Sequence, residues 1–204
     1  MKIKLILLLV FVASNFVSSA QFEMQGIIRP RFEFRDGYST LRNDTTSPAA
    51  FVSQRTRLNF LYQKGKLETM LSIYDFRVWG DQALKQDMAS FGLNEAWAKI
   101  SLNDAWSIKL GRQALKYDNS RLISPVNWNQ IGAAHDALLV QYKKNDWTID
   151  FGTAYNQSSV SKFGTYYEFY ESHYKSLNFL WISKKFENFT MYFINRVCQT
   201  TSNN

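Results

Sequence analysis

Apolar and polar residues alternate along most of the chain after residue 20. In the segment 147–156, Trp147, Ile149 and Phe151 share one parity while polar residues or glycine occupy most of the other. The segments 55–62 and 106–113 repeat this pattern, and apolar residues again fall at every second position at 177–181. A helix would place residues two apart on nearly opposite sides and would mix these two sets. The alternation therefore predicts β-strands.

The spacing of polar stretches predicts how these strands are connected. Compact polar turns occur at 64–66, 103–104, 144–146 and 184–185, and longer polar stretches lie near 36–51, 79–91, 116–133 and 157–172. Each interval holds two alternating segments of about ten residues, and many of them carry an aromatic residue near one end. This layout favours an all-β fold, an antiparallel transmembrane β-barrel represented by an incomplete set of about nine strands. A secreted soluble β-sandwich with one wet face is the alternative.

Two predicted strands carry charge on their apolar side. Asp75 and Arg77 continue the parity of Leu71, and Asp136 shares the parity of Leu138. Either a β-bulge switches the faces there, or these charges lie beyond the apolar band of the membrane. The sequence leaves both explanations open.

The first twenty residues have the pattern of a cleaved signal peptide. Lys2 and Lys4 precede an apolar run from Leu5 to Val17, and the small residues of 18–20 follow. Residues 1–20 are therefore expected to direct export, and 21–204 to form the N-terminal part of an outer-membrane barrel. After the signal, no stretch approaches 18 consecutive apolar residues.

Basic residues are concentrated near the start of the expected barrel. Between positions 29 and 57 there are six arginines against three acidic residues. Arg29, Arg31 and Arg35 share one parity, and a lipid-facing arginine near the membrane midplane would cost about 2–4 kcal/mol. This row should therefore face a wet lumen, with Phe32 and Phe34 facing lipid. Its function could be anion selectivity, or only pairing with acidic residues that stiffens the wall; the available partners are Glu23, Glu33, Glu68, Glu95 and Asp150.

Motifs for catalysis and metal binding are not apparent. The chain has two histidines and one cysteine, without an HExxH, CxxC, GxSxG or phosphate-binding loop. No cofactor, metal or nucleic-acid partner is expected, nor is an enzyme. One alternative is an outer-membrane lipid or peptide hydrolase using His135 and Asp136, and another is a barrel that never conducts. The sequence does not indicate an oligomeric state.

Several stretches resemble the alginate export family of outer-membrane barrels. They are RPRFEFRDGY (29–38), FVSQRTRLNF (51–60), DFRVWGD (75–81), LNEAWAKI (93–100), LGRQALKYDNSRLISPVNW (110–128) and HDAL (135–138). The similarity extends from about Phe22 to Tyr155. It implies a cell outer membrane location, contact with outer-membrane lipid, and export of an anionic solute, an acidic polysaccharide, through an electropositive pore.

The resemblance also assigns positions to basic residues. By resemblance, Arg29, Arg31, Arg55 and Arg57 lie on the lumen wall, together with Arg35 of the same row, and Arg77, Lys109, Arg112 and Arg121 lie near the constriction. The family's barrels have eighteen strands, whereas nine are expected here, and a closed bacterial barrel of one chain has an even number. We therefore expect this sequence to be the N-terminal half of a longer protein.

Overall fold

A computed structural model of the chain describes residues 21–39, 41–42, 44–85, 90–157, 159–160, 162–163, 174–187 and 190–199. Within these residues the chain forms nine strands: β1 (Gln21–Arg35), β2 (Ala49–Lys64), β3 (Leu67–Val78), β4 (Phe91–Ser101), β5 (Trp106–Gln113), β6 (His135–Lys144), β7 (Trp147–Tyr155), β8 (Ser176–Lys185) and β9 (Thr190–Gln199). The predicted all-β fold with about nine strands is confirmed. The expected signal peptide, residues 1–20, lies outside the described residues.

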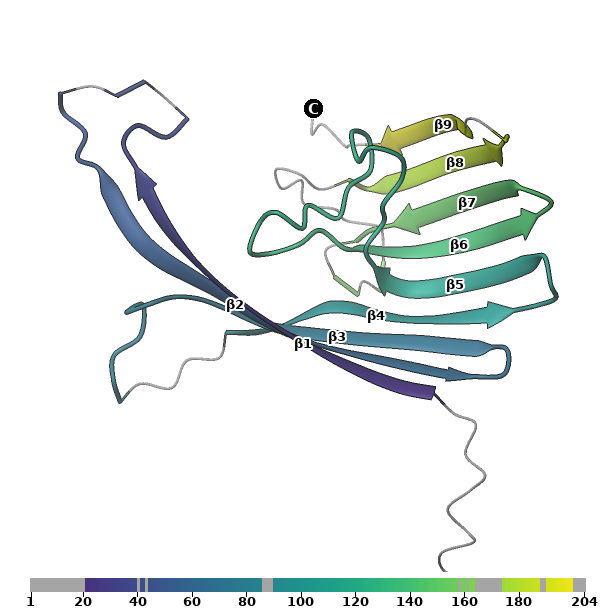
Figure 1. Cartoon of the computed structure of the whole chain (residues 1–204), viewed down its shortest axis with the longest axis horizontal. Helices are drawn as coiled ribbons and strands as arrows, with labels where there is room; N and C mark the ends of the chain where they lie inside the picture. The colour runs from purple at the N-terminus through teal and green to yellow at the C-terminus, as the bar shows by residue number, and fades with distance from the viewer. Residues whose placement is uncertain are drawn as a thin grey trace, which may run out of the picture.

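The strands form a single antiparallel sheet in which each strand pairs with its neighbours in the sequence (Figure 1). The sheet is not closed, because β1 pairs only with β2 and β9 only with β8. It is consistent with an incomplete β-barrel. In a lipid bilayer such edges are stable only when another strand pairs with them, since an unpaired backbone group there costs several kcal/mol.

The described part of the chain contains no helix long and apolar enough to cross a membrane.

The connections at the two ends of the sheet differ in length, as the polar stretches predict. The turns β2–β3, β4–β5, β6–β7 and β8–β9 are short and lie at one end, here called the short-turn side (Figure 1). Asn145 and Asp146 form the two-residue β6–β7 turn with φ of 49° and 64°. This left-handed conformation is typical of type I′ turns, whose twist matches that of the flanking strands. The longer connections lie at the opposite end, the long-loop side.

The two faces of the sheet have different compositions. Directly paired residues of antiparallel strands lie on the same face, so the register assigns every strand residue to a face. One face, here called the outer face, exposes large apolar side chains, among them Ile28, Phe32 and Phe34. The other, the inner face, carries Arg29 and its pairing partner Arg55. The predicted separation of the arginine row from its neighbouring aromatic residues is thus present.

The charges on the apolar parity of β3 and β6 lie on the outer face near the long-loop side. The register between β2 and β3 is continuous through Arg77, which pairs with Gln54. The register shift lies between β3 and β4. Ser72 pairs with Glu95 and Ile73 with Leu93, so the extra residue is Asn94 of β4. The β5–β6 register is also continuous. Of the two explanations, a face switch by a bulge is therefore wrong for these strands.

The apolar parity of β8 faces inward. Leu177 and Phe179 pair with Ala154 and Gly152 on the inner face. All but Gly152 belong to the buried core. The alternation at 177–181 is confirmed, but here the apolar side covers a loop inside the sheet rather than facing outward.

Candidate functional site: an arginine-anchored loop on the inner face

The connection between β5 and β6, residues 114–134, folds across the inner face and is here called the inner loop. At one end it contacts β1, where Arg29 Nη1 donates to the carbonyl of Asn127 at 2.8 Å. At the other it contacts β9, where Arg196 Nη1 donates to the carbonyl of Leu122 at 2.9 Å. The loop therefore spans the sheet between its two edges. The sequence predicts a long polar connection here, but not that it lies inside.

The first half of the inner loop packs as a hydrophobic core. Leu115, Tyr117 and Ile123 are buried against the inner face of the sheet, in one cluster with core residues of β6–β8. The rings of Tyr117 and Phe179 meet edge to face with centroids 5.1 Å apart. Gly152 makes room for this contact, because a Cβ there would lie 2.2 Å from the Phe179 ring. Burial of apolar area is thus the main force that holds this half of the loop.

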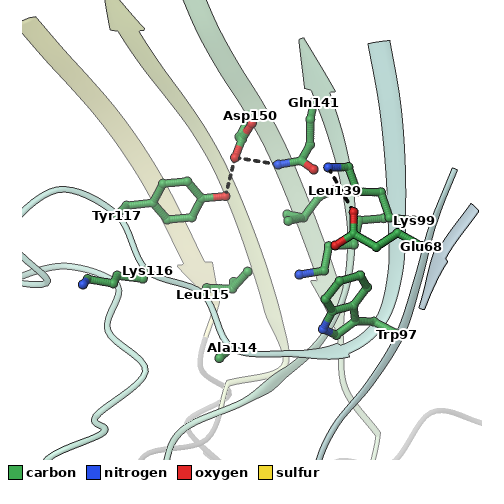
Figure 2. Close-up of a pocket in the computed structure, with 11 residues that line it drawn as sticks. Glu68, Trp97, Lys99, Ala114, Leu115, Lys116, Tyr117, Leu139, Gln141 and Asp150 are labelled. Atoms are coloured by element: carbon green, nitrogen blue, oxygen red, sulfur yellow. Dashed lines mark hydrogen bonds and ion pairs between the residues drawn. The ribbon is translucent and has the colours of Figure 1, made fainter. Parts of the chain in front are cut away.

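Two polar contacts support the apolar half. The hydroxyl of Tyr117 donates to Asp150 Oδ2 at 2.9 Å, and Trp181 Nε1 donates to Asp118 Oδ1 at 2.8 Å (Figure 2 shows the first). Burial raises the pKa of Tyr117 above its ordinary value, and the neighbouring Asp150 carboxylate raises it further. Tyr117 therefore stays protonated and continues to donate.

The second half of the inner loop is held by arginines of β1 and β2. Arg29 donates from Nη2 to the carbonyl of Asn129 at 2.5 Å, and Arg31 donates from Nη1 to the carbonyl of Trp128 at 3.0 Å. Arg55 Nη1 donates to Asn127 Oδ1 at 3.2 Å. These guanidinium groups thus bind neutral oxygens of the loop.

Gln130 fixes this half of the loop to the sheet, a role that the sequence pattern does not predict. Its side chain is 1% exposed. Its Nε2 donates to Ser53 Oγ at 2.9 Å, while its Oε1 accepts from Arg29 Nε at 3.0 Å. A glutamine in a long polar stretch has no distinguishing sequence signal, because such residues are usually solvated.

The arginines differ in how their charge is balanced. Glu33 forms ion pairs with Arg31 and Arg35, each at 2.6 Å. None of the ion pairs among the described residues includes Arg29, Arg55 or Arg57.

The third arginine without a carboxylate partner is also bound by a neutral group. Arg57 is 7% exposed, and its Nη2 donates to Asn94 Oδ1 at 3.1 Å. The adjacent Arg55 is 3% exposed. Because a hydrogen bond to an amide or a carbonyl leaves the charge in place, three positive charges remain together on one wall.

The other basic residues assigned by resemblance are scattered. Arg77 and Arg112 lie on the outer face, where they pair with Asp75 at 2.7 Å and with Asp136 at 3.2 Å. Arg121 is exposed on the inner loop.

Lys109 lies on the inner face, and its Nζ is 3.7 Å from the centroid of the Trp97 ring. The fold therefore brings Arg29, Arg31, Arg55 and Arg57 together. It separates Arg77 and Arg112 from them. Both lie on the outer face, whereas a residue at the constriction would have to lie on the inner face.

His135 and Asp136 do not form a joint site. They are consecutive strand residues and so lie on opposite faces. His135 Nδ1 is 2.8 Å from the hydroxyl of Tyr174, whereas Asp136 pairs with Arg112 on the outer face. Among the described residues, no three His, Cys, Asp or Glu side chains cluster in a way that could hold a metal ion.

Comparison with known protein families gives one match. Residues 17–163 match the model of the family described as alginate export, which agrees with the resemblance noted in the sequence. None of the curated proteins matches the chain. The family match includes β1 to β7 and the whole inner loop.

Proposed function

The chain belongs to the alginate export family, a family of outer-membrane proteins, and on this premise we propose that it conducts an anionic solute, an acidic polysaccharide, along an arginine-lined lumen. The inner face would form part of the lumen wall and the outer face would contact lipid. The observation that carries this proposal is the group of Arg29, Arg55 and Arg57, none of which has a carboxylate ion partner.

Positive charge without a direct carboxylate partner on a lumen wall favours anions in two ways. Fixed positive charge beside low-dielectric walls raises the local concentration of anions and speeds their entry. Several adjacent cationic groups also allow a charged polymer to move from one group to the next without being trapped. The partly exposed Arg29, Arg31 and Arg35 on β1 form such a set, and the buried Arg55 and Arg57 on β2 add to the positive field.

The inner loop would set the width of the passage. It occupies the space in front of the inner face from β1 to β9 and is fixed at both ends, by Arg29 and by Arg196. A passing polymer would therefore move along the loop and the arginine wall, and would exchange contacts with both.

The test is ion selectivity. The protein purified from outer membranes is reconstituted into planar bilayers, and the reversal potential is measured under a salt gradient. We expect anion selectivity that falls clearly when Arg55 and Arg57 are both replaced by Ser. Arg77→Gln is the matched control: it removes a positive charge from the outer face and should leave the selectivity unchanged. Cation selectivity of the wild type, or an equal effect of Arg77→Gln, would contradict the proposal.

A second candidate function is a barrel that does not conduct. It is favoured by the same loop, because the loop contacts the inner face at both edges of the sheet and occupies hydrogen-bond donors of Arg29 and Arg55. A folded, reconstituted sample without conductance would support it. The hydrolase alternative has no comparable support, since His135 and Asp136 lie on opposite faces.

A further inference from the structure

The charged residues of the outer face are distributed unequally between its two ends. The strand register places these basic and acidic strand residues on this face: Lys64, Arg77, Arg112, Lys144 and Lys184, with Asp75 and Asp136. Near the long-loop side, Asp75 and Asp136 pair with the two arginines. The short-turn end has the three lysines and, among the strand residues of this face, no acidic residue. Its positive charge is therefore not balanced within the strands.

Two of these lysines lie on either side of a tryptophan at the short-turn side. Trp147, the first residue of β7, pairs with Lys144 on β6 and with Lys184 on β8. Lys184 Nζ is 5.0 Å from the centroid of the Trp147 ring and donates to the carbonyl of Asn145 at 3.1 Å. Because Asn145 directly follows Lys144, this contact brings the Lys184 ammonium toward the end of β6. We call Lys144, Trp147 and Lys184 the rim cluster.

The ammonium groups of the rim cluster have donors available to a ligand. In the part of the chain that the structure describes, no ion pair includes Lys144 or Lys184. Lys184 uses one of its three donors on a neutral carbonyl.

The short turns beside the rim cluster also contain carboxylates. Asp104 and Asp146 line one hollow together with Lys143 and Lys185. These two lysines offset the two aspartates in number, so the charges of Lys144 and Lys184 remain in excess. The rim cluster therefore favours an anionic partner.

The outer face next to the rim cluster, away from the turns, is apolar. The following outward positions of β7 and β8 pair as Ile149 with Ile182 and Phe151 with Leu180. Phe151 is 47% exposed and Leu180 is 36% exposed. From Trp147 to Phe151 this apolar strip extends about 13 Å along the strand. A ligand that contacts both the strip and the lysines must carry an anionic group beside a hydrocarbon chain.

A glycerophospholipid with net negative charge has this chemistry. Its phosphate accepts hydrogen bonds from ammonium groups, and indole rings lie at the depth of its headgroup region. Short turns of outer-membrane barrels face the periplasm, where the leaflet consists of glycerophospholipids. We propose that the rim cluster binds one anionic glycerophospholipid, with its phosphate on Lys144 and Lys184 and an acyl chain along the apolar strip.

This proposal rests on the part of the proposed function that places the outer face in lipid. It does not depend on conduction, because the rim cluster and the arginines of the lumen wall lie on opposite faces of the sheet. Lipid binding and ion selectivity can therefore be changed separately.

The first test compares two lipids with the same acyl chains. The full chain, purified from outer membranes in a neutral detergent, is titrated separately with phosphatidylglycerol and with phosphatidylcholine, and bound lipid is counted by native mass spectrometry. Both lipids have a phosphate, but the choline cation makes the net charge of phosphatidylcholine zero. We expect the first phosphatidylglycerol to bind at least about tenfold more tightly, because each lysine near an anionic lipid contributes roughly fivefold. Equal affinities for the two lipids would overturn the proposal.

Variants then test the location of the site. Replacing both Lys144 and Lys184 by Gln should lower the affinity for phosphatidylglycerol to about that for phosphatidylcholine. Lys64→Gln is the matched control, because it removes an outer-face lysine at the same end of the sheet but on β2, away from β6 and β8. It should bind phosphatidylglycerol like the wild type. Circular dichroism checks that each variant is folded. Wild-type affinity in the folded double variant, or an equal loss in Lys64→Gln, would overturn the proposal.

A soluble headgroup analogue tests the contribution of the apolar strip. Glycerol 3-phosphate has the phosphate but no acyl chain, so it gains nothing from burial of the strip. In large excess it should leave phosphatidylglycerol bound. Displacement of the lipid would show a site for small anions only and would overturn the proposal.

The outcomes also separate this proposal from the proposed function. Anion-selective conductance with equal affinities for the two lipids would overturn the lipid site and leave the arginine-lined channel in place. Preferential phosphatidylglycerol binding that is lost in the double variant, in a protein without anion selectivity, would support the lipid site and overturn the channel.

Discussion

The two halves of the inner loop are held to the sheet by different interactions. Near β6–β8, Tyr117 and its apolar neighbours are buried against Phe179. Near β1 and β2, guanidinium groups of Arg29 and Arg55 donate to loop oxygens. The apolar anchor depends on surface removed from water, and it is insensitive to anions. The arginine anchor depends on donors that a carboxylate binds more strongly than a carbonyl does.

Under the proposed function, this difference indicates which half of the loop a passing polyanion would displace. A carboxylate reaching Arg29 would replace neutral loop oxygens with a charge-assisted partner. The same carboxylate has nothing to gain from the buried side chains of Leu115 and Tyr117; at this end of the loop the guanidinium contact is that of Arg196 with the carbonyl of Leu122. We therefore expect an acidic polymer to loosen residues 127–130 and to leave residues 115–117 in place.

The largest effect should come from breaking the apolar anchor. Phe179→Ala removes the ring that packs on Tyr117, at an expected cost of about 3–5 kcal/mol. The inner loop should then open far more often and be cut by trypsin after Lys116 or Arg121, about 100-fold faster. Limited proteolysis with mass spectrometry measures this rate. Phe193→Ala on the outer face is the matched control, and an equal increase there would show that the effect is not specific to the loop contact.

A smaller effect should come from breaking the arginine anchor. Arg29→Gln removes charge-assisted hydrogen bonds to residues 127–130, each worth about 1.5–3 kcal/mol, although part of this is recovered by hydration. We expect a nitroxide at position 128, in a Cys198→Ser background, to become more mobile by electron paramagnetic resonance.

An acidic polysaccharide added to the wild type should have the same effect as Arg29→Gln, and a label at the exposed position 116, between the buried Leu115 and Tyr117, should respond to neither. Arg42→Gln, a surface change, serves as the control. Increased mobility at both labelled positions would contradict the division of the loop into two anchors.

The smallest effect concerns the polar contact within the apolar anchor. Tyr117→Phe removes the hydrogen bond to Asp150 and should destabilise the closed loop by about 1 kcal/mol at neutral pH. The pKa of Tyr117 is raised when the loop is closed, so its contribution is fully present below the unfolded value of about 10 and is lost as pH rises further. The difference between wild type and Tyr117→Phe in tryptic cleavage should therefore shrink above pH 10. A difference that grows there would contradict the assignment.

Much of the fold follows from local patterns. Period-two alternation predicts the strands, and the contrast between short and long polar stretches predicts the two ends of the sheet. The position of Arg29 opposite in parity to Phe32 also follows, because side chains alternate strictly along a strand. Parity cannot say which face receives a loop, and for this reason the inward side of Phe179 could not be predicted.

The sequence alone determined the strand periodicity, the separation of arginines from the outer-face aromatics, and the family. The tertiary structure decided what the arginines contact, because Gln130 and the carbonyls of the inner loop reach Arg29 on β1 from about 100 residues away. It also decided that Arg77 and Arg112 lie on the outer face, since only the strand register relates them to Arg55. Backbone carbonyls carry no sequence signal, and their role as partners for guanidinium groups arises only when the chain folds.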